Sequence, residues 1–144
     1  MPIVVAYTPK PEGRAALRTA AAEAGLRSVD LVVVVAIRVP NGSGSESGGV
    51  DPASVSDEAI GQVLGEGAPA YSVVRYADSM DPADDIITAA EDAGADAIVI
   101  GLRRRSPVGK LILGSTAQRI LLDASCPVIA VKADAGDDSG PARA

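Results

Sequence analysis

The sequence predicts an α/β fold: a doubly wound, five-stranded parallel sheet with helices on both faces. Two observations lead to this prediction. The 144-residue chain is 47% hydrophobic and only 2% aromatic, so its core consists of aliphatic side chains, which suit strands buried on both faces. Short aliphatic runs also alternate with segments of helical spacing, as in right-handed βαβ units. The predicted strands are Ile3 to Tyr7, Leu31 to Ile37, Tyr71 to Tyr76, Ala97 to Ile100 and Val128 to Val131.

Two helices are predicted in the first half of the chain. The clearest helical spacing runs from Glu12 to Ala24 and places small and aliphatic side chains on one face. A second helix is predicted from Val55 to Leu64. Its signal is weaker, because Gly61 interrupts it and Gly65 bounds it.

Two more helices follow in the second half. Asp81-Pro82 supplies a capping residue and a proline at the first helical position, and Gly94 ends that helix. Its apolar stripe consists of Ile86, Ile87, Ala90 and Ala93. The last helix begins at Gly114-Ser115 and stops before Cys126-Pro127. The side chains that we expect to point inward from it are Ala117, Ile120, Leu121 and Ala124.

The composition along the chain indicates one domain over residues 1–132. Residues 41–49 read NGSGSESGG, which predicts a flexible Gly/Ser loop within that domain. Residues 133–144 are small and acidic, and we expect them to form a disordered tail.

Charge and residue types exclude several functions. A formal charge of −6 argues against nucleic acid and anionic membranes as partners. Without histidine, and with Cys126 as the only cysteine, neither the usual zinc sites nor a Ser-His-Asp or Cys-His pair can form. Cys126 is predicted to be a buried apolar residue. No apolar run approaches the ~20 residues that span a bilayer, and no signal-peptide pattern is present, so we expect a cytoplasmic protein.

The segment after the fourth predicted strand carries the candidate site. In open α/β sheets, ligands lie beyond the carboxyl ends of the strands, often with phosphate at a helix N-terminus. Residues 101–116 read GLRRRSPVGKLILGST and lead into the last helix. The segment supplies glycines, the cations Arg103, Arg104, Arg105 and Lys110, and the hydroxyls of Ser115 and Thr116. These groups could cradle an anion, although the spacing is not that of a Walker P-loop.

The same segment resembles the nucleotide signature of the universal stress protein family. Gly101, twelve residues, and then Gly114-Ser115 match the outer frame of that signature. The flanking runs, Asp96 to Gly101 and Cys126 to Val131, are also similar to the family. The resemblance implies a five-stranded, Rossmann-like domain of the adenine nucleotide alpha hydrolase type. It also implies a homodimer. In ATP-binding members of the family, the phosphates bind at the loop glycines and at the Gly-Ser start of the helix.

Carried over residue by residue, the resemblance assigns Gly101, Gly114 and Ser115 to the phosphates, with Thr116 as a further donor. The second glycine of the signature falls on Arg104, so a guanidinium there, with Arg103 beside it, would hold a phosphate instead. The Asp-Gly-Ser that commonly follows the first strand is replaced by Thr8-Pro9-Lys10, so Thr8 and Lys10 are the nucleotide-binding candidates there. Lys10 either meets a phosphate or, with Pro11, belongs to a rigid turn that starts the first helix.

Three functions remain open at this point. The first is a cytoplasmic stress-response module that binds an adenine nucleotide, ATP or AMP, with Mg²⁺ as a companion ion. The alternative is a dimeric interaction protein of the same fold that binds no nucleotide. The third is slow ATP hydrolysis, for which no catalytic residue can be named.

Two further expectations concern partners and charged groups. The last strand is apolar throughout and is predicted at a sheet edge, so we expect a homodimer through Val128, Ile129, Ala130 and Val131. No residue is predicted to ligate a metal. The acidic residues from Asp84 to Asp92 are expected to form a solvated helix face, with no two carboxylates at a shared centre.

Overall fold

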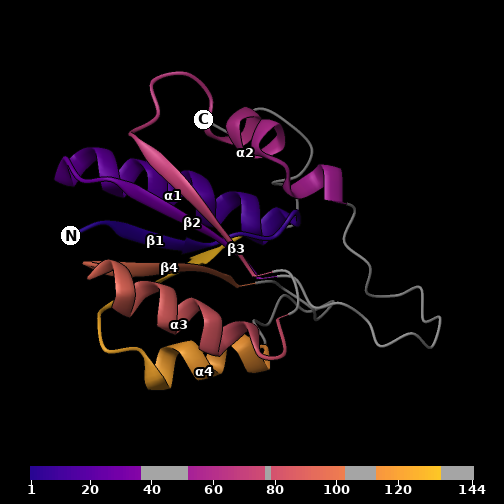
Figure 1. Cartoon of the computed structure of the whole chain (residues 1–144), viewed down its shortest axis with the longest axis vertical. Helices are drawn as coiled ribbons and strands as arrows, with labels where there is room; N and C mark the ends of the chain where they lie inside the picture. Colours follow the sequence, from indigo (N-terminus) through magenta and orange to yellow (C-terminus); the bar gives the residue numbers. More distant parts are fainter. Residues whose placement is uncertain (37–51, 77–78, 103–112, 134–144) are drawn as a thin grey trace.

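The computed structural model describes residues 1–36, 52–76, 79–102 and 113–133. These residues form a five-stranded parallel sheet of order β3-β2-β1-β4-β5, covered by helices (Figure 1). The strands are β1 (Ile3–Ala6), β2 (Leu31–Ala36), β3 (Tyr71–Tyr76), β4 (Ala97–Leu102) and β5 (Val128–Lys132). The helices are α1 (Pro11–Arg27), α2 (Asp57–Leu64), α3 (Pro82–Ala93) and α4 (Ser115–Asp123), with a 3₁₀ turn η2 (Pro52–Val55) before α2. The predicted doubly wound α/β fold is confirmed.

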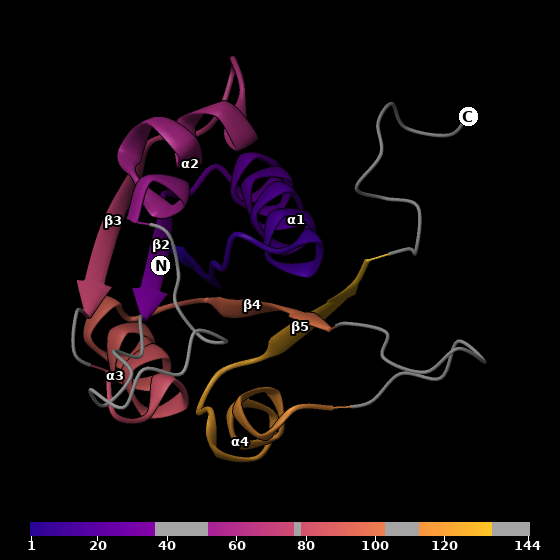
Figure 2. The same cartoon turned by 90° about the vertical axis from the view of Figure 1, so that its right-hand side faces the viewer.

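The strand order reverses at β1. This strand pairs in parallel with β2 on one side, Ile3 opposite Leu31, and with β4 on the other, Ile3 opposite Ala97. The chain lays α1 and α2 on one face of the sheet and α3 and α4 on the other (Figures 1 and 2). A crevice is therefore expected at the carboxyl ends of β1 and β4, where the crossovers diverge.

Each face of the sheet has its own core. Ile3 and Val5 pack under α1 and α2, while Val4 between them packs under α3 and α4. All three side chains have no exposed surface. Because the sheet is covered on both faces, every position of the central strand is apolar, which explains why the strands read as continuous aliphatic runs.

The ends of α1 and α3 follow their local signals to different extents. Asp81 caps α3, its side chain accepting a hydrogen bond from the Ala83 N–H at 3.1 Å, and Gly94 ends the helix in the left-handed conformation. Helix α1, however, continues past the predicted end at Ala24 to Arg27. It ends at Ser28, whose left-handed backbone (φ 57°) lets its N–H reach the last carbonyls. Gly25 lies inside the helix and gives no stop there.

Helix α4 begins at the predicted position, but its inward face differs from the prediction. Ile120 is the residue that α4 buries fully, and Ala117 and Ala124 pack partly against the same core. Leu121 was expected to point inward and is 40% exposed. The prediction for Leu121 is wrong: consecutive helical residues point about 100° apart, and with Ile120 directed into the core Leu121 lies toward the exposed side of α4.

Several expectations fall on residues outside the described ranges. These are the Gly/Ser loop 41–49 and the tail from residue 134 onward. Ala133, with which the predicted tail begins, is described and buried after the end of β5. Among the helices that the structure describes, none is long and apolar enough to cross a membrane.

Candidate functional site

A cavity of about 480 Å³ lies at the carboxyl ends of β1, β2 and β4. It lies next to the N-terminal ends of α3 and α4, from which Pro82, Gly114 and Thr116 contribute to its lining. This is the crevice that the reversal of strand order predicts. Its described lining consists of Ala6, Tyr7, Thr8, Glu12, Gly13, Val34, Ala36, Pro82, Ile86, Ile100, Gly101, Leu102, Leu113, Gly114, Thr116, Ala117 and Ile120.

The walls of the cavity are mainly aliphatic. Ala6 and Ala36 are the last residues of β1 and β2, and Ile86 and Ile120 face them from α3 and α4. Sequence reasoning assigned Ile86 and Ile120 to the core and did not place any of these four residues in a site. Their position at the strand ends beside the reversal is the signal that could have found them. Apolar walls of this kind can hold the flat face of a nucleobase.

The start of α4 supplies the polar rim. Gly114 caps the helix with an extended backbone and carries no side chain that could satisfy the first N–H groups. The Gln118 N–H donates to the Gly114 carbonyl at 3.0 Å, so the N–H groups of residues 115–117 precede the first intrahelical bond. The positive end of the helix dipole adds to these donors. The rim can therefore accept an anion.

The structure brings together some of the predicted site residues and separates others. Thr8, Gly101, Gly114 and Thr116 line the cavity. Ser115 faces a separate hollow of about 270 Å³, which it shares with Asp81 and Arg119. Lys10 does not line the cavity. Arg103 and Arg104, together with Arg105 and Lys110, lie outside the described residues.

Gly101 has a structural reason for being glycine. It lies within β4, which continues to Leu102, two residues beyond the predicted strand end at Ile100. A Cβ at Gly101 would lie 2.6 Å from the carbonyl carbon of Glu12 and closer still to its oxygen. The first turn of α1 therefore rests directly on β4, and this contact forms one edge of the cavity.

The turn after β1 is built in the same way. A Cβ at Gly13 would lie 2.7 Å from the carbonyl carbon of Thr8, so the exposed Thr8 is pressed against α1. Lys10 takes the N-cap position with an extended backbone, and Pro11 begins the helix. The guanidinium of Arg14 donates to the Pro9 carbonyl at 3.0 Å. These contacts agree with the interpretation of residues 8–11 as a rigid turn.

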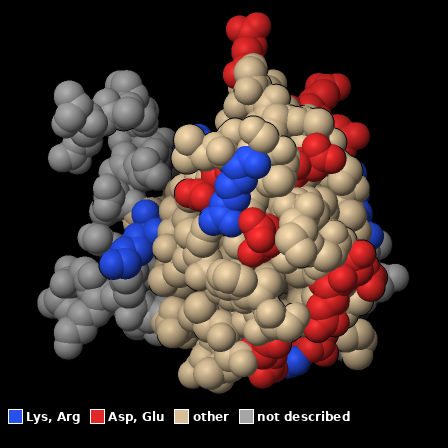
Figure 3. Space-filling view, turned by 90° about the vertical axis from the view of Figure 1, so that its left-hand side faces the viewer, with Lys and Arg blue, Asp and Glu red and all other residues tan. Residues whose placement is uncertain are grey.

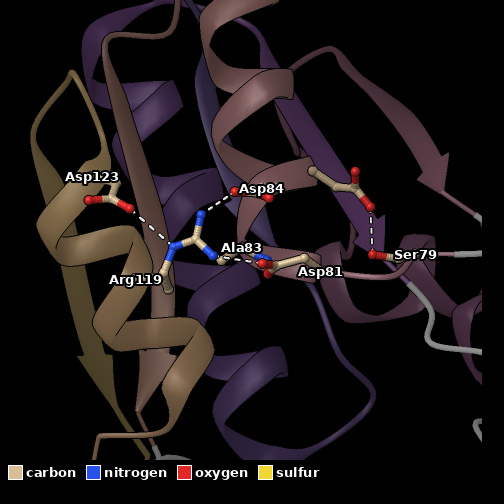
Figure 4. Close-up of polar contacts among 7 residues, drawn as sticks. Ser79, Asp81, Ala83, Asp84, Arg119 and Asp123 are labelled. Atoms are coloured by element: carbon tan, nitrogen blue, oxygen red, sulfur yellow. Dashed lines mark hydrogen bonds and ion pairs between the residues drawn. The ribbon is translucent and has the colours of Figure 1, made fainter.

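A group of carboxylates meets around Arg119, between α3 and α4, where none was expected (Figure 4). Arg119 donates from Nη1 to Asp81 at 2.6 Å, from Nε to Asp123 at 3.0 Å, and from Nη2 to Asp84. The prediction that no two carboxylates share a centre is therefore wrong. Asp81 and Asp84 lie 38 and 35 residues from Arg119 in sequence, so only the packing of α3 on α4 brings them together.

The carboxyl group of Asp81 shows the effect of Arg119. Desolvation raises its pKa, but the hydrogen bond and charge of Arg119, with backbone N–H groups of Asp84 and Ala83, outweigh it and lower the pKa overall. Within the described residues, no group of three or more Asp, Glu or Cys side chains is arranged to hold a metal ion. Asp81, Asp84 and Asp123 contact Arg119, and Asp81 also caps α3.

The opposite side of the molecule carries a similar arginine with a structural role. There, acidic side chains cover more of the surface than basic ones (Figure 3). Arg27, near the end of α1, pairs with Glu23 at 3.2 Å and with Asp96 before β4 at 2.7 Å. This side lies at the amino ends of the strands, away from the cavity.

Burial shifts the pKa values of Tyr7 and Cys126. Burial raises the pKa of Tyr7, and the charges of Arg14 and Arg18 oppose that shift. Cys126 packs against the α3–α4 core but is half-buried, not buried as predicted. Burial, with a smaller contribution from the charge of Asp96, raises the pKa of its thiol, which disfavours the reactive thiolate.

Comparison with known proteins matches the whole described chain to one family. The model of the universal stress protein family matches residues 1–132. A universal stress protein of Mycolicibacterium smegmatis is 35% identical over 130 residues, which cover 90% of this chain and 96% of that protein. A universal stress protein from Archaeoglobus fulgidus has a similar structure, with a TM-score of 0.69 and 35% identity over 92% of this chain and 98% of the other. A second Archaeoglobus fulgidus structure, in complex with dAMP, has a TM-score of 0.64 and 29% identity over the same shares. The chain therefore belongs to the universal stress protein family.

Proposed function

We propose that this protein binds an adenine nucleotide in the cavity at the carboxyl ends of β1, β2 and β4. The observation that carries the proposal is the combination of aliphatic walls with the uncapped start of α4 at the rim. The volume, about 480 Å³, lies within the range of about 300–1,000 Å³ that is typical of small-molecule sites. The base and ribose would lie against the walls, and the phosphates would meet the helix start.

The relative solved with dAMP supports this ligand class. That protein is 29% identical to this chain, and the match covers 92% of this chain. We choose ATP over a monophosphate because residues 103–110 supply four cations between β4 and α4, two elements that both line the cavity. Arginine and lysine side chains there could neutralise a triphosphate, with Mg²⁺ bound to the phosphates. The ligand would then act as a regulatory signal in a cytoplasmic stress response, with slow hydrolysis at most.

A substitution at Gly114 tests the site directly. No described atom lies within 4 Å of the position that a Cβ would take at Gly114, so Gly114→Ala should fold normally. The added methyl would, however, stand where phosphate approaches the N–H groups of α4. Titration calorimetry with AMP, ATP and Mg-ATP should show binding to the wild-type protein and an affinity about tenfold lower for Gly114→Ala, a difference of about 1.4 kcal/mol.

Gly25→Ala is the matched control. Its Cβ position is also free of neighbours within 4 Å, but Gly25 lies near the far end of α1. This variant should bind nucleotide as the wild type does. Absence of any nucleotide binding by wild-type protein freed of bound ligand would contradict the proposal. An equal affinity in Gly114→Ala would reject the phosphate position.

The edge position of β5 supports a second proposal, a homodimer. β5 pairs with β4 on one side and is last in the strand order, and no strand among the described residues pairs with its other side. Ala130 is exposed on this strand, while Val128, Ile129 and Val131 are half-buried. We propose that two copies pair symmetrically through β5.

Analytical ultracentrifugation can test the dimer. The wild-type protein should sediment as a dimer at micromolar concentration, and Ala130→Lys should sediment as a monomer because the two-fold axis brings the added charges together. A monomeric wild-type protein contradicts the dimer. A dimer that binds no nucleotide would instead support the alternative, an interaction protein of the same fold.

A further inference from the structure

Arg119 joins the two helices that flank the cavity. Its Nη1 and Nη2 bind Asp81 and Asp84 at the start of α3, and its Nε binds Asp123 on its own helix (Figure 4). Both ends of this connection adjoin the cavity wall. Pro82, directly after Asp81, lines the cavity, and so does Thr116, one helical turn before Arg119. The ion pairs therefore lie just behind the wall that α3 and α4 form.

Helix α4 depends on contacts of this kind for its position. It has nine residues, its N-cap has no side-chain hydrogen bond, and it fully buries one side chain, Ile120. A helix this short is not stable on its own in water, so tertiary contacts must hold it. Arg119 anchors it to Asp81, which is itself fixed by its hydrogen bond to the Ala83 N–H.

Two physical effects of Arg119 can be separated. The first is positional, because ion pairs to Asp81 and Asp84 restrain the distance between the helix starts. The second is electrostatic, because without the guanidinium the carboxylates of Asp81 and Asp84 would remain near the rim and repel an anionic ligand. Arg119 and its three aspartate partners have side chains that are 41–59% exposed. At such exposure an isolated ion pair contributes little to stability, whereas a network around one planar guanidinium contributes more.

We propose that Arg119 is a positioning residue for nucleotide binding: its ion pairs with Asp81 and Asp84 hold the start of α4 against α3 and so preform the cavity. The choice of ligand rests on the proposed function above. The restraint on α4 does not, because it is a property of the protein without ligand.

The first arm of the test measures affinity. In Arg119→Ala the dissociation constant should rise about tenfold for AMP and about threefold for uncharged adenosine. Asp84→Asn separates the two effects, since a purely electrostatic role predicts tighter AMP binding after loss of a carboxylate. The positional role predicts weaker binding of both ligands, about twofold. Arg119→Lys should fall between wild type and Arg119→Ala, because an ammonium lacks the planar fork that engages several carboxylates.

The second arm measures amide hydrogen exchange in the protein without ligand. The amides of Gln118 and Ile120 should exchange about tenfold faster in Arg119→Ala than in wild type. Arg27→Ala is the matched control. Like Arg119, Arg27 pairs with a residue four positions away, Glu23, and with a distant aspartate, Asp96, and its side chain is 39% exposed. This variant should change neither the exchange of α4 nor the affinity for AMP.

The outcomes distinguish this inference from the proposed function. Wild-type protein that binds neither AMP nor adenosine rejects the proposed function, and the role of Arg119 is then decided by exchange alone. Unchanged exchange at Gln118 and Ile120 in a folded Arg119→Ala protein overturns the positioning role. Tighter AMP binding in Asp84→Asn also overturns it, in favour of a purely electrostatic effect.

Discussion

Replacing Gly101 with alanine should destabilise the protein and disturb the cavity together. The new Cβ would lie 2.6 Å from the Glu12 carbonyl carbon and closer still to its oxygen, whereas ordinary contact begins at 3.4 Å, so the first turn of α1 must recede by more than about 0.8 Å. The obstacle is backbone, which cannot rotate away as a flexible side chain can. Overpacking of this kind costs about 1–3 kcal/mol. We expect a loss of about 2–3 kcal/mol and a melting temperature lower by roughly 10 °C.

Thermal unfolding followed by circular dichroism would measure this effect, and AMP titration would measure its consequence for the cavity. Glu12 and Gly101 both line the cavity, so affinity should fall as α1 moves. Gly25→Ala is the same chemical change in open space and should raise stability by about 0.5–1 kcal/mol through helix propensity. If Gly101→Ala melted within 1–2 °C of wild type, roughly the shift expected for less than 1 kcal/mol, the close packing of α1 on β4 would be refuted.

Three further predictions concern α4, Asp81 and Cys126. Ile120→Ala should lower the free energy of unfolding in urea by about 3 kcal/mol, and Leu121→Ala by less than about 1 kcal/mol, because Ile120 is 1% exposed and Leu121 is 40% exposed. Equal losses in the two variants would contradict the inward position of Ile120. Because the folded-state pKa of Asp81 is lowered, its contribution to stability is present above the unfolded-state pKa and is lost as the pH falls through the folded-state pKa. Asp81→Asn should therefore weaken the acid dependence of unfolding below about pH 4, and an unchanged pH profile would refute this role. Iodoacetamide should alkylate Cys126 at least about tenfold more slowly in native protein than in urea at pH 8, because burial and Asp96 raise the thiol pKa; equal rates would show an accessible thiolate.

Local signals in the sequence were sufficient for much of the fold. Asp81-Pro82 and Gly94 marked both ends of α3, because a capping oxygen and a left-handed glycine act within one helical turn. The end of α1 carried no such signal: Gly25 lies inside the helix, and Ser28 takes the left-handed position instead. Leu121 was misplaced because a short apolar run does not show which of its residues faces the sheet.

The site could be located from the sequence but not built from it. The strand-to-helix segment after β4 leads to the cavity, and Thr8, Gly101, Gly114 and Thr116 do line it. The aliphatic walls were not predicted as a site, because Ala6, Val34 and Ile86 look like ordinary core residues until three elements meet. Lys10 does not line the cavity, and Ser115 lines the second hollow, although its N–H belongs to the rim, since one residue along a helix or turn changes the direction of a side chain.

The sequence by itself determined the alternation of strands and helices, the parallel sheet and the family resemblance, because periodicity and capping are encoded in residues close together in the chain. Only the tertiary structure decided that α1 rests on Gly101 and that Arg119 meets Asp81 and Asp84. The physical reason is that these contacts depend on how the crossovers lay separate helices on the sheet. That arrangement is set by packing over the whole domain, and no short window of sequence contains it.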